Sequence, residues 1–168
     1  MNTDKYIDDL DLSRFNLFQQ GNSTAKTFYY TDDLPPLEDL FPDHIYYAIL
    51  HKKNQGSDVG HWVLLVRWDD STFEYFDCLG DAAPIEVVTM LDNYSELNSQ
   101  PINLIESGRQ LMNRNNFICG KWVMFRIMTL PNTLPQFHKF IDMITAKKKV
   151  TADAVVNFMI NIPFKFSP

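Results

Sequence analysis

The sequence has little basic charge, few cysteines and no long apolar run. Its 168 residues carry 15 Lys and Arg against 21 Asp and Glu, and this net charge of −6 argues against a protein that coats nucleic acid. Two cysteines are too few for the disulfide framework of a small secreted domain. No stretch approaches the ~18 unbroken apolar residues of a membrane span. The acidic start, MNTDKYIDDLDLSRF, lacks the pattern of a signal peptide, so we expect an intracellular protein without a membrane segment.

The composition is that of a folded protein. With 45% hydrophobic and 14% aromatic residues, the chain is too apolar to be disordered. Its length predicts one domain over residues 1–168, and the sequence contains no internal repeat. Within that domain we distinguish a variable N-terminal segment (1–36), a central core (44–130) and C-terminal helices (133–168).

Local patterns predict strands in the middle of the chain and helices at its end. We expect strands over 44–51, 61–68, 72–79 and 101–105, and helices over 37–41, after Pro84, over 121–130, after Thr133 and after Thr151. In the helix after Pro84, spacing places Ile85, Val88 and Leu91 on one face. The last helix is expected to run through Ala154, Val155, Phe158 and Met159. This order of elements is typical of an α+β fold.

The predicted hairpin over 61–79 brings a histidine and a carboxylate together. Facing positions in an antiparallel hairpin have a constant sum, here about 139, so position 77 faces position 62, next to His61. Cross-strand neighbours have Cβ atoms roughly 4.5–8 Å apart, which lets Asp77 accept a hydrogen bond from the imidazole of His61. The carboxylate would fix the ring tautomer and favour its protonated form. The alternative is a surface His–Asp pair without function.

Cys119 stands at the start of the predicted buried helix. Unpaired backbone N–H groups and the helix dipole favour a thiolate there, and Gly120 leaves room for a substrate backbone. The alternative is a small buried apolar side chain, which is the commoner role of a cysteine. Cys, His and Asp could also bind zinc, but the sequence lacks paired-ligand spacing such as CxxC or HxxxH. We therefore favour a nucleophile and expect no metal.

Three segments carry a resemblance to a known family. Gly60-His61-Trp62, then Tyr75-Phe76-Asp77-Cys78-Leu79-Gly80, then Cys119-Gly120-Lys121-Trp122 resemble the cysteine peptidases related to the adenovirus maturation protease and the SUMO proteases. The resemblance is strongest to capsid-maturation proteases of virophages, Polinton-like elements and large DNA viruses, and it covers about residues 44–130. It implies a small mixed central sheet flanked by helices, related to papain by circular rearrangement, with the catalytic Cys at the start of a buried helix.

The resemblance assigns roles to single residues. It implies that Cys119 is the nucleophile, His61 the general base and Asp77 the residue that orients His61. In the family, the side-chain amide of a Gln a few positions before the Cys helps to bind the oxyanion. Gln110 is our first choice for that role, and Asn113, which is closer to the family's spacing, is its rival.

Three neighbouring residues receive smaller roles. Cys78 alternates away from Asp77 along the predicted strand and is expected to be a packed bystander. Trp62 is expected in the core, where the family places an aromatic side chain under the catalytic groups. Trp62 and Gly120 are also predicted to contact substrate.

The implied function is that of an endopeptidase that needs no cofactor and cleaves viral capsid or core precursors during virion maturation. Cleavage is expected after small residues, at Gly-Gly or Gly-X sites, and the protein is expected in the virion and in host cytoplasm. A protease that removes SUMO or ubiquitin-like modifiers is the alternative enzyme. An inactive interaction module with the same fold is a further alternative.

A lysine cluster predicts a possible activator site. Some relatives use DNA or a short peptide as an activator, and Lys147, Lys148 and Lys149, with Lys139, could bind phosphate groups. The alternative is a solvated helix end, because lysines are favourable at helix C-termini.

Overall fold

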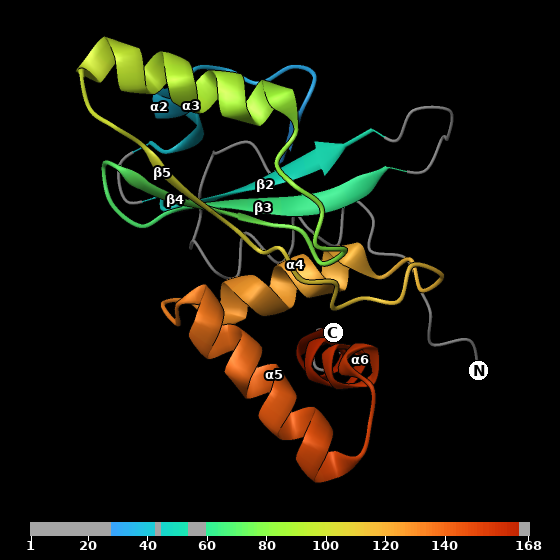
Figure 1. The fold of residues 1–168 in the computed structure, drawn as a ribbon. Helices are drawn as coiled ribbons and strands as arrows, with labels where there is room; N and C mark the ends of the chain where they lie inside the picture. The colour runs from blue at the N-terminus through green and yellow to red at the C-terminus, as the bar shows by residue number, and fades with distance from the viewer. Residues whose placement is uncertain (1–27, 43–44, 54–59, 165–168) are drawn as a thin grey trace.

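The computed structural model describes residues 28–42, 45–53 and 60–164 (Figure 1). Its strands are β1 (Tyr29–Tyr30), β2 (Tyr47–Lys52), β3 (His61–Arg67), β4 (Thr72–Phe76) and β5 (Asn103–Glu106). Its helices are α2 (Leu37–Leu40), α3 (Ile85–Asn98), α4 (Cys119–Met128), α5 (Leu134–Lys148) and α6 (Ala152–Phe164). The segment before position 28 and the predicted loop at 54–58 lie outside the described residues. That all of these elements form one domain stays a prediction.

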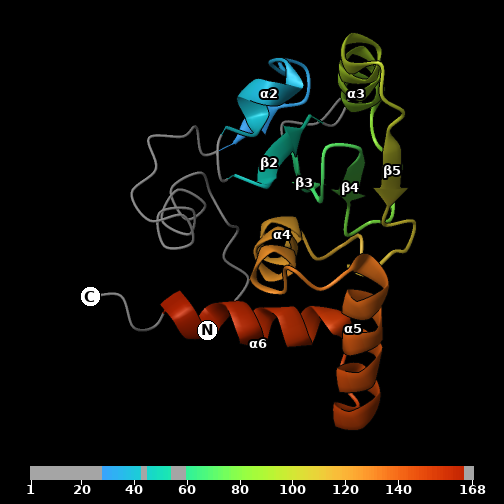
Figure 2. The same ribbon diagram turned by 90° about the vertical axis from the view of Figure 1, so that its left-hand side faces the viewer.

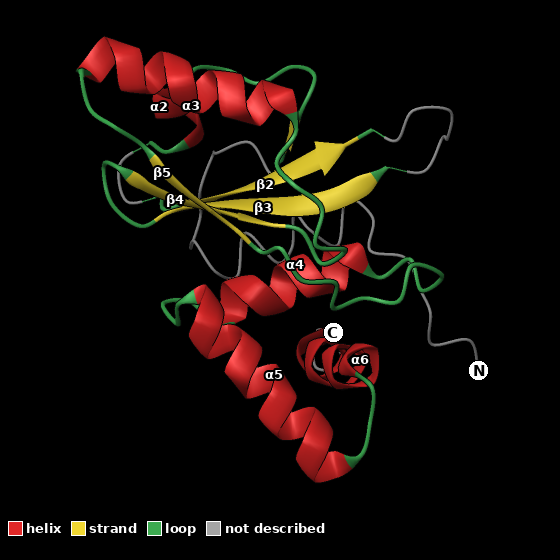
Figure 3. Cartoon of the chain, viewed as in Figure 1, coloured by secondary structure: helices red, strands yellow, loops and turns green. Residues whose placement is uncertain are grey.

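The strands form one mixed sheet in the order β1-β2-β3-β4-β5. The central pairs β2–β3 and β3–β4 are antiparallel, and the outer pairs β1–β2 and β4–β5 are parallel. Helices α2 and α3 cover one face of the sheet, and α4 covers the other, with α5 and α6 beyond it (Figures 1, 2 and 3). The predicted α+β class, a small mixed sheet flanked by helices, is confirmed.

The central strand β3 is buried on both faces, as its apolar sequence predicts. Trp62, Leu64 and Val66 pack against α4 and the C-terminal helices, whereas Val63 and Leu65 pack against α2 and α3. This alternation follows from the two-residue period of a strand. Strand β3 therefore holds His61 at the end of the most deeply buried element of the sheet.

Helix α4 is buried from Cys119 to Ile127, which confirms the predicted buried helix. Its two cationic side chains have partners inside the protein. Arg126 pairs with Glu74 of β4, and Lys121 donates a hydrogen bond of 2.7 Å to Asn157 of α6. A buried cation is stable only when it is paired and hydrogen-bonded. These contacts therefore explain how a helix with two cationic side chains can lie in the core.

The lysine cluster lies at the end of α5. Lys147 and Lys148 occupy its exposed last turn, and Lys149 adopts the left-handed conformation at the C-cap. At the other end, Thr133 and Gln136 form a capping box, and the helix begins after Thr133 as predicted. Activation by DNA or a peptide stays a prediction. In the described ranges, no helix is long and apolar enough to cross a membrane.

The apolar face predicted for the helix after Pro84 is not the buried face of α3. Ile85 is 70% exposed, and the buried face of α3 consists of Val87, Met90, Leu91 and Tyr94. That set follows the i, i+3, i+4, i+7 pattern, so the true face is rotated away from the predicted one, and only Leu91 is shared. In α6, the buried side consists of Val155, Val156 and Ile160, whereas Phe158 is 68% exposed.

Candidate active site

The hairpin places His61 and Asp77 in direct contact. Leu64 faces Phe76, so the register differs from the predicted one by a single residue. Strand β4 ends at Phe76, and Asp77 lies just beyond it, where its Oδ1 is 2.7 Å from His61 Nε2. Both side chains are buried, with Asp77 fully inaccessible. The predicted contact between His61 and Asp77 is therefore present, and the pair is buried instead of lying on the surface.

A tight turn fixes the orientation of the Asp77 carboxylate. Its Oδ1 also accepts the backbone N–H of Leu79 at 2.8 Å, and the hydroxyl of Ser107 donates to the Asp77 carbonyl at 2.8 Å. Gly80 closes the turn with φ +77°, and a Cβ there would lie 2.6 Å from the Arg109 carbonyl carbon. Because only glycine fits this conformation and this space, Gly80 is needed to hold Asp77 in place.

Cys119 lies against the start of β3, next to His61. It is the first residue of α4, and its Sγ accepts the backbone N–H of Trp62 at 3.5 Å. Trp62 directly follows His61, so the sulfur lies next to the histidine, and interaction with Cys119 is one of the causes that raise the pKa of the His61 ring. Since Asp77 occupies Nε2, Nδ1 is the ring nitrogen left for Cys119. In this arrangement, His61 can act as the base that activates the Cys119 thiol, while the Asp77 carboxylate orients the imidazole ring.

The environment of His61 favours the imidazolium. Burial lowers the pKa of the ring, but hydrogen bonds and charge interactions with Asp77 and Cys119 outweigh burial and raise the pKa to about 9. The folded protein therefore retains this proton at neutral pH, whereas an unfolded histidine with a pKa near 6.5 has largely lost it. A protonated ring beside a cysteine is the form that can donate a proton to a leaving group.

The raised His61 pKa predicts that stability falls as pH rises from 6.5 to above 9. In this range the folded state binds the proton more tightly than the unfolded state, so the contribution is fully present below pH 6.5 and is lost as pH passes about 9. Urea unfolding at several pH values should show a loss of about 2–3 kcal/mol for the wild type and a much smaller one for His61→Gln.

His138→Gln is the matched control for that experiment. Burial lowers the pKa of His138, so its charge change lies below the tested range. The variant should therefore keep the wild-type dependence above pH 6.5. An unchanged pH dependence in His61→Gln would contradict the assigned environment of His61.

Cys78 lies closer to the pair than strand alternation predicts. Residues 77–80 form a turn instead of continuing the strand, and the Cys78 sulfur, a His61 nitrogen and an Asp77 oxygen lie within 4.8 Å of one another. Burial raises the pKa of the Cys78 thiol, and its Sγ contacts Met112 Sδ at 3.8 Å. A thiol must lose its proton to attack a carbonyl or bind a metal, so this environment suits neither role.

Trp62 and the two glycines shape the surroundings of the site. The Trp62 ring is buried and lies edge-to-face with His51 and Phe28, at centroid distances of 4.4 and 5.0 Å. A Cβ at Gly60 would meet the His51 ring at 1.8 Å, which explains a glycine before His61. Gly120 is buried in the first turn of α4. Trp62 is in the core as expected, and the substrate contacts of Trp62 and Gly120 stay predictions.

The two amides considered for the oxyanion hole make local contacts. Gln110 lies in the loop after β5, beyond the end of that strand, and its Nε2 donates to the Met112 carbonyl at 3.1 Å. Asn113 accepts the N–H of Asn115 through its side-chain oxygen at 3.0 Å. Both side chains lie in the segment leading to Cys119, and neither contact decides between them.

Asp153 is a buried polar residue near the site that sequence reasoning missed. Its carboxylate accepts the indole N–H of Trp122 at 2.9 Å, the side-chain N–H of Asn116 at 2.6 Å and the backbone N–H of Asn113 at 2.9 Å. The only local signal is an acidic residue next to the apolar face of α6. Its partners are 31 to 40 positions away, so the sequence alone does not reveal them.

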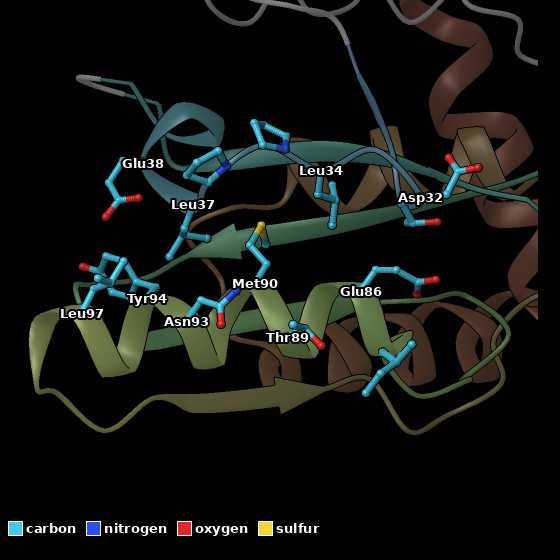
Figure 4. Close-up of a pocket in the computed structure, with 14 residues that line it drawn as sticks. Asp32, Leu34, Leu37, Glu38, Glu86, Thr89, Met90, Asn93, Tyr94 and Leu97 are labelled. Carbon is cyan, nitrogen blue, oxygen red and sulfur yellow. The ribbon is translucent and has the colours of Figure 1, made fainter.

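A groove of about 580 Å³ lies away from these residues (Figure 4). It runs between the 31–38 segment and α3, on the face of the sheet opposite α4. Its lining includes Asp32, Glu38 and Glu86 together with apolar side chains. Because Cys119 lies on α4, this groove is not part of the Cys119 site.

A scan against models of known protein families finds no match. In sequence, the chain is similar to the uncharacterized protein V9 of the Sputnik virophage, with 23% identity over 173 residues that cover 92% of this chain and 97% of V9. Among solved structures, it is similar to the ASFV pS273R protease, with a TM-score of 0.43 and 16% identity over 54% of this chain and 36% of the protease. A second structure of that protease gives a TM-score of 0.36 and 17% identity over 49% and 32%. The chain thus spans about a third of the length of the solved protease chains that it matches.

Proposed function

We propose that the chain is a cysteine endopeptidase with Cys119 as its nucleophile. The observation that carries this proposal is the buried contact of 2.7 Å between His61 Nε2 and Asp77 Oδ1, beside Cys119, whose Sγ accepts the N–H of Trp62 next to His61. The three residues come from the start of a helix, the start of a strand and a turn, so distant parts of the chain converge on one imidazole. A cysteine that merely filled space in the core would need neither partner.

In the proposed reaction, the Cys119 thiolate attacks the carbonyl carbon of the scissile peptide and forms a C–S bond. The carbonyl oxygen becomes an oxyanion, which the backbone N–H of Cys119 and a side-chain amide stabilise. His61 donates its proton to the amine nitrogen as the C–N bond breaks, which leaves a thioester. The neutral His61 then takes a proton from water, whose oxygen attacks the thioester and releases the acid product and Cys119. Asp77 holds the ring in the required orientation throughout.

The side-chain donor is proposed to be Gln110, with Asn113 as the rival. The loss of one oxyanion donor typically lowers kcat about 10²–10³-fold. Measurement of kcat for Gln110→Ala and for Asn113→Ala therefore assigns the role to the residue whose replacement gives that decrease.

The proposed substrates are viral capsid or core precursors, cleaved after small residues at Gly-Gly or Gly-X sites in the virion or in host cytoplasm. Support comes from the likeness of the GHW, YFDCLG and CGKW segments to capsid-maturation proteases and from the sequence similarity to a virophage protein. The runner-up is a protease acting on SUMO or ubiquitin-like modifiers, which uses the same three catalytic groups.

A comparison of substrates tests this choice. Purified protein should hydrolyse a fluorogenic Gly-Gly peptide faster than a fluorogenic ubiquitin-like modifier, and it should cut a co-expressed capsid precursor at one site that N-terminal sequencing identifies. Faster turnover of the folded modifier would instead assign the deconjugating activity. No Cys119-dependent hydrolysis of any of these substrates would favour an inactive interaction module.

A further inference from the structure

A buried side chain of helix α6, Asp153, holds the segment that precedes Cys119. Residues 113–116 form a turn in which the Asn116 N–H donates to the Asn113 carbonyl at 2.9 Å, and all four residues are exposed. Asp153, in the first turn of α6 and only 6% exposed, accepts the backbone N–H of Asn113 and the side-chain N–H of Asn116 through Oδ2. An exposed polar turn is thereby tied to the protein interior.

The second oxygen of the same carboxylate binds the helix that carries the nucleophile. Asp153 Oδ1 accepts the indole N–H of Trp122 at 2.9 Å, and Trp122 lies fully buried three positions after Cys119. The Trp122 backbone N–H bonds the Ile118 carbonyl at 3.2 Å, within the first turn of α4. One carboxylate thus fixes the distance between the 113–116 turn and the start of α4.

The opposite end of the segment is also anchored. The backbone N–H groups of Leu111 and Met112 both donate to the Cys78 carbonyl, at 2.8 and 3.0 Å. Between this anchor and Cys119, Asp153 supplies the side-chain contacts to α6. Both amides considered for the oxyanion hole lie in or next to the stretch between these two anchors. An oxyanion hole works only if its donors are fixed in advance relative to the nucleophile's own N–H.

We infer that Asp153 is a positioning residue, which holds the segment before Cys119 in register with the first turn of α4 and thereby preorganises the oxyanion hole. This inference rests on the proposed peptidase function. It assigns no contact between Asp153 and substrate. Its effect on the reaction is transmitted through the 113–116 turn and Trp122.

The test is Asp153→Asn, which keeps the size of the side chain but breaks the bridge. An amide has one oxygen and one NH₂ group, so whichever way it turns, its NH₂ faces either the indole N–H of Trp122 or the N–H groups of the turn. We expect kcat for peptide hydrolysis to fall about 10²-fold with little change in KM, because a small misplacement of catalytic groups has effects of that size. The rate of Cys119 alkylation by iodoacetamide should change less than about twofold, since it depends on the thiolate and forms no oxyanion.

Asn157→Ala is the matched control. It removes another hydrogen bond between α6 and α4, the 2.7 Å bond from Lys121, but does not touch the 113–116 turn. It should leave kcat unchanged. Equal losses of kcat in Asn157→Ala and Asp153→Asn would show that general docking of α6 matters, and would overturn the assignment.

Other outcomes separate this inference from the proposed function. A folded Asp153→Asn protein with wild-type kcat overturns the inference alone, whereas a wild type without Cys119-dependent hydrolysis overturns both. If Asp153→Asn does not fold, Asn116→Ala removes one of the two donors of the turn. A decrease in its kcat at unchanged alkylation rate then supports the inference, and an unchanged kcat contradicts it.

Discussion

Replacement of Cys119 by Ala should abolish peptide hydrolysis, with a decrease in kcat of about 10⁶-fold, as found when the nucleophile of a catalytic triad is removed. The Cys119 sulfur is the atom that forms the covalent bond, and burial raises the pKa of the thiol of Cys78, the other cysteine near the imidazole of His61. The protein should stay folded, because Ala is a good helix former and Cys119 is the first residue of α4. The measurement is single-turnover hydrolysis of the Gly-Gly peptide, with circular dichroism to check folding.

Cys78→Ala is the control for this prediction. Cys78 is the other buried cysteine, and its sulfur lies near His61 and Asp77, so it tests whether proximity alone produces activity. Because burial raises the pKa of its thiol, we expect this variant to retain most of the activity. Full activity in Cys119→Ala together with an inactive Cys78→Ala would exchange the roles of the two cysteines.

The largest expected effect on stability is that of Arg126→Met. Arg126 and Glu74 are fully buried and form two hydrogen bonds, Nε to Oε1 at 2.8 Å and Nη2 to Oε2 at 2.9 Å. The indole N–H of Trp68 and the carbonyl of Asn132 complete the network. Loss of one partner leaves a buried, unpaired charge, which should lower the free energy of unfolding by about 3–5 kcal/mol. The midpoint of thermal unfolding should fall by about 6–20 °C.

An exposed ion pair provides the comparison. Arg67 pairs with the exposed Asp70, so Arg67→Met should cost at most about 1 kcal/mol. The double variant Arg126→Met, Glu74→Leu removes both buried charges and should regain much of the stability that the single variant loses. Arg126→Met with a stability within 1 kcal/mol of the wild type would show that the pair is not a structural link between β4 and α4.

The contact between His61 and Asp77 and the helix start at Cys119 could both be predicted from the sequence, because the positions of neighbouring residues allow few arrangements. A short hairpin allows only a few registers, so an error of one residue still left Asp77 next to His61. The change from a polar loop to a run of apolar residues predicted that Cys119 stands at the start of a buried helix. Both inferences use neighbours in sequence, for which local rules are strong.

The features that were missed depend on packing between distant segments. The bond between Asp153 and Trp122 spans 31 positions, and that between Glu74 and Arg126 spans 52, so neither pair has a spacing rule. The spacing of Ile85, Val88 and Leu91 marks one apolar face of α3, but the position of the sheet buries the neighbouring face, which consists of Val87, Met90, Leu91 and Tyr94. Strand β5 ends at Glu106, and Gln110 lies in the loop beyond it, where its position depends on contacts that no local sequence pattern encodes.

Covalent labelling by a peptide that ends in an electrophile, such as a Gly-Gly vinyl sulfone, tests the central claim most directly. Intact mass spectrometry followed by peptide mapping should find one adduct per chain, located on Cys119, and His61→Ala should slow its formation strongly. An adduct on Cys78, or no adduct on the native wild-type protein, would contradict the assignment of Cys119 as the nucleophile of a peptidase.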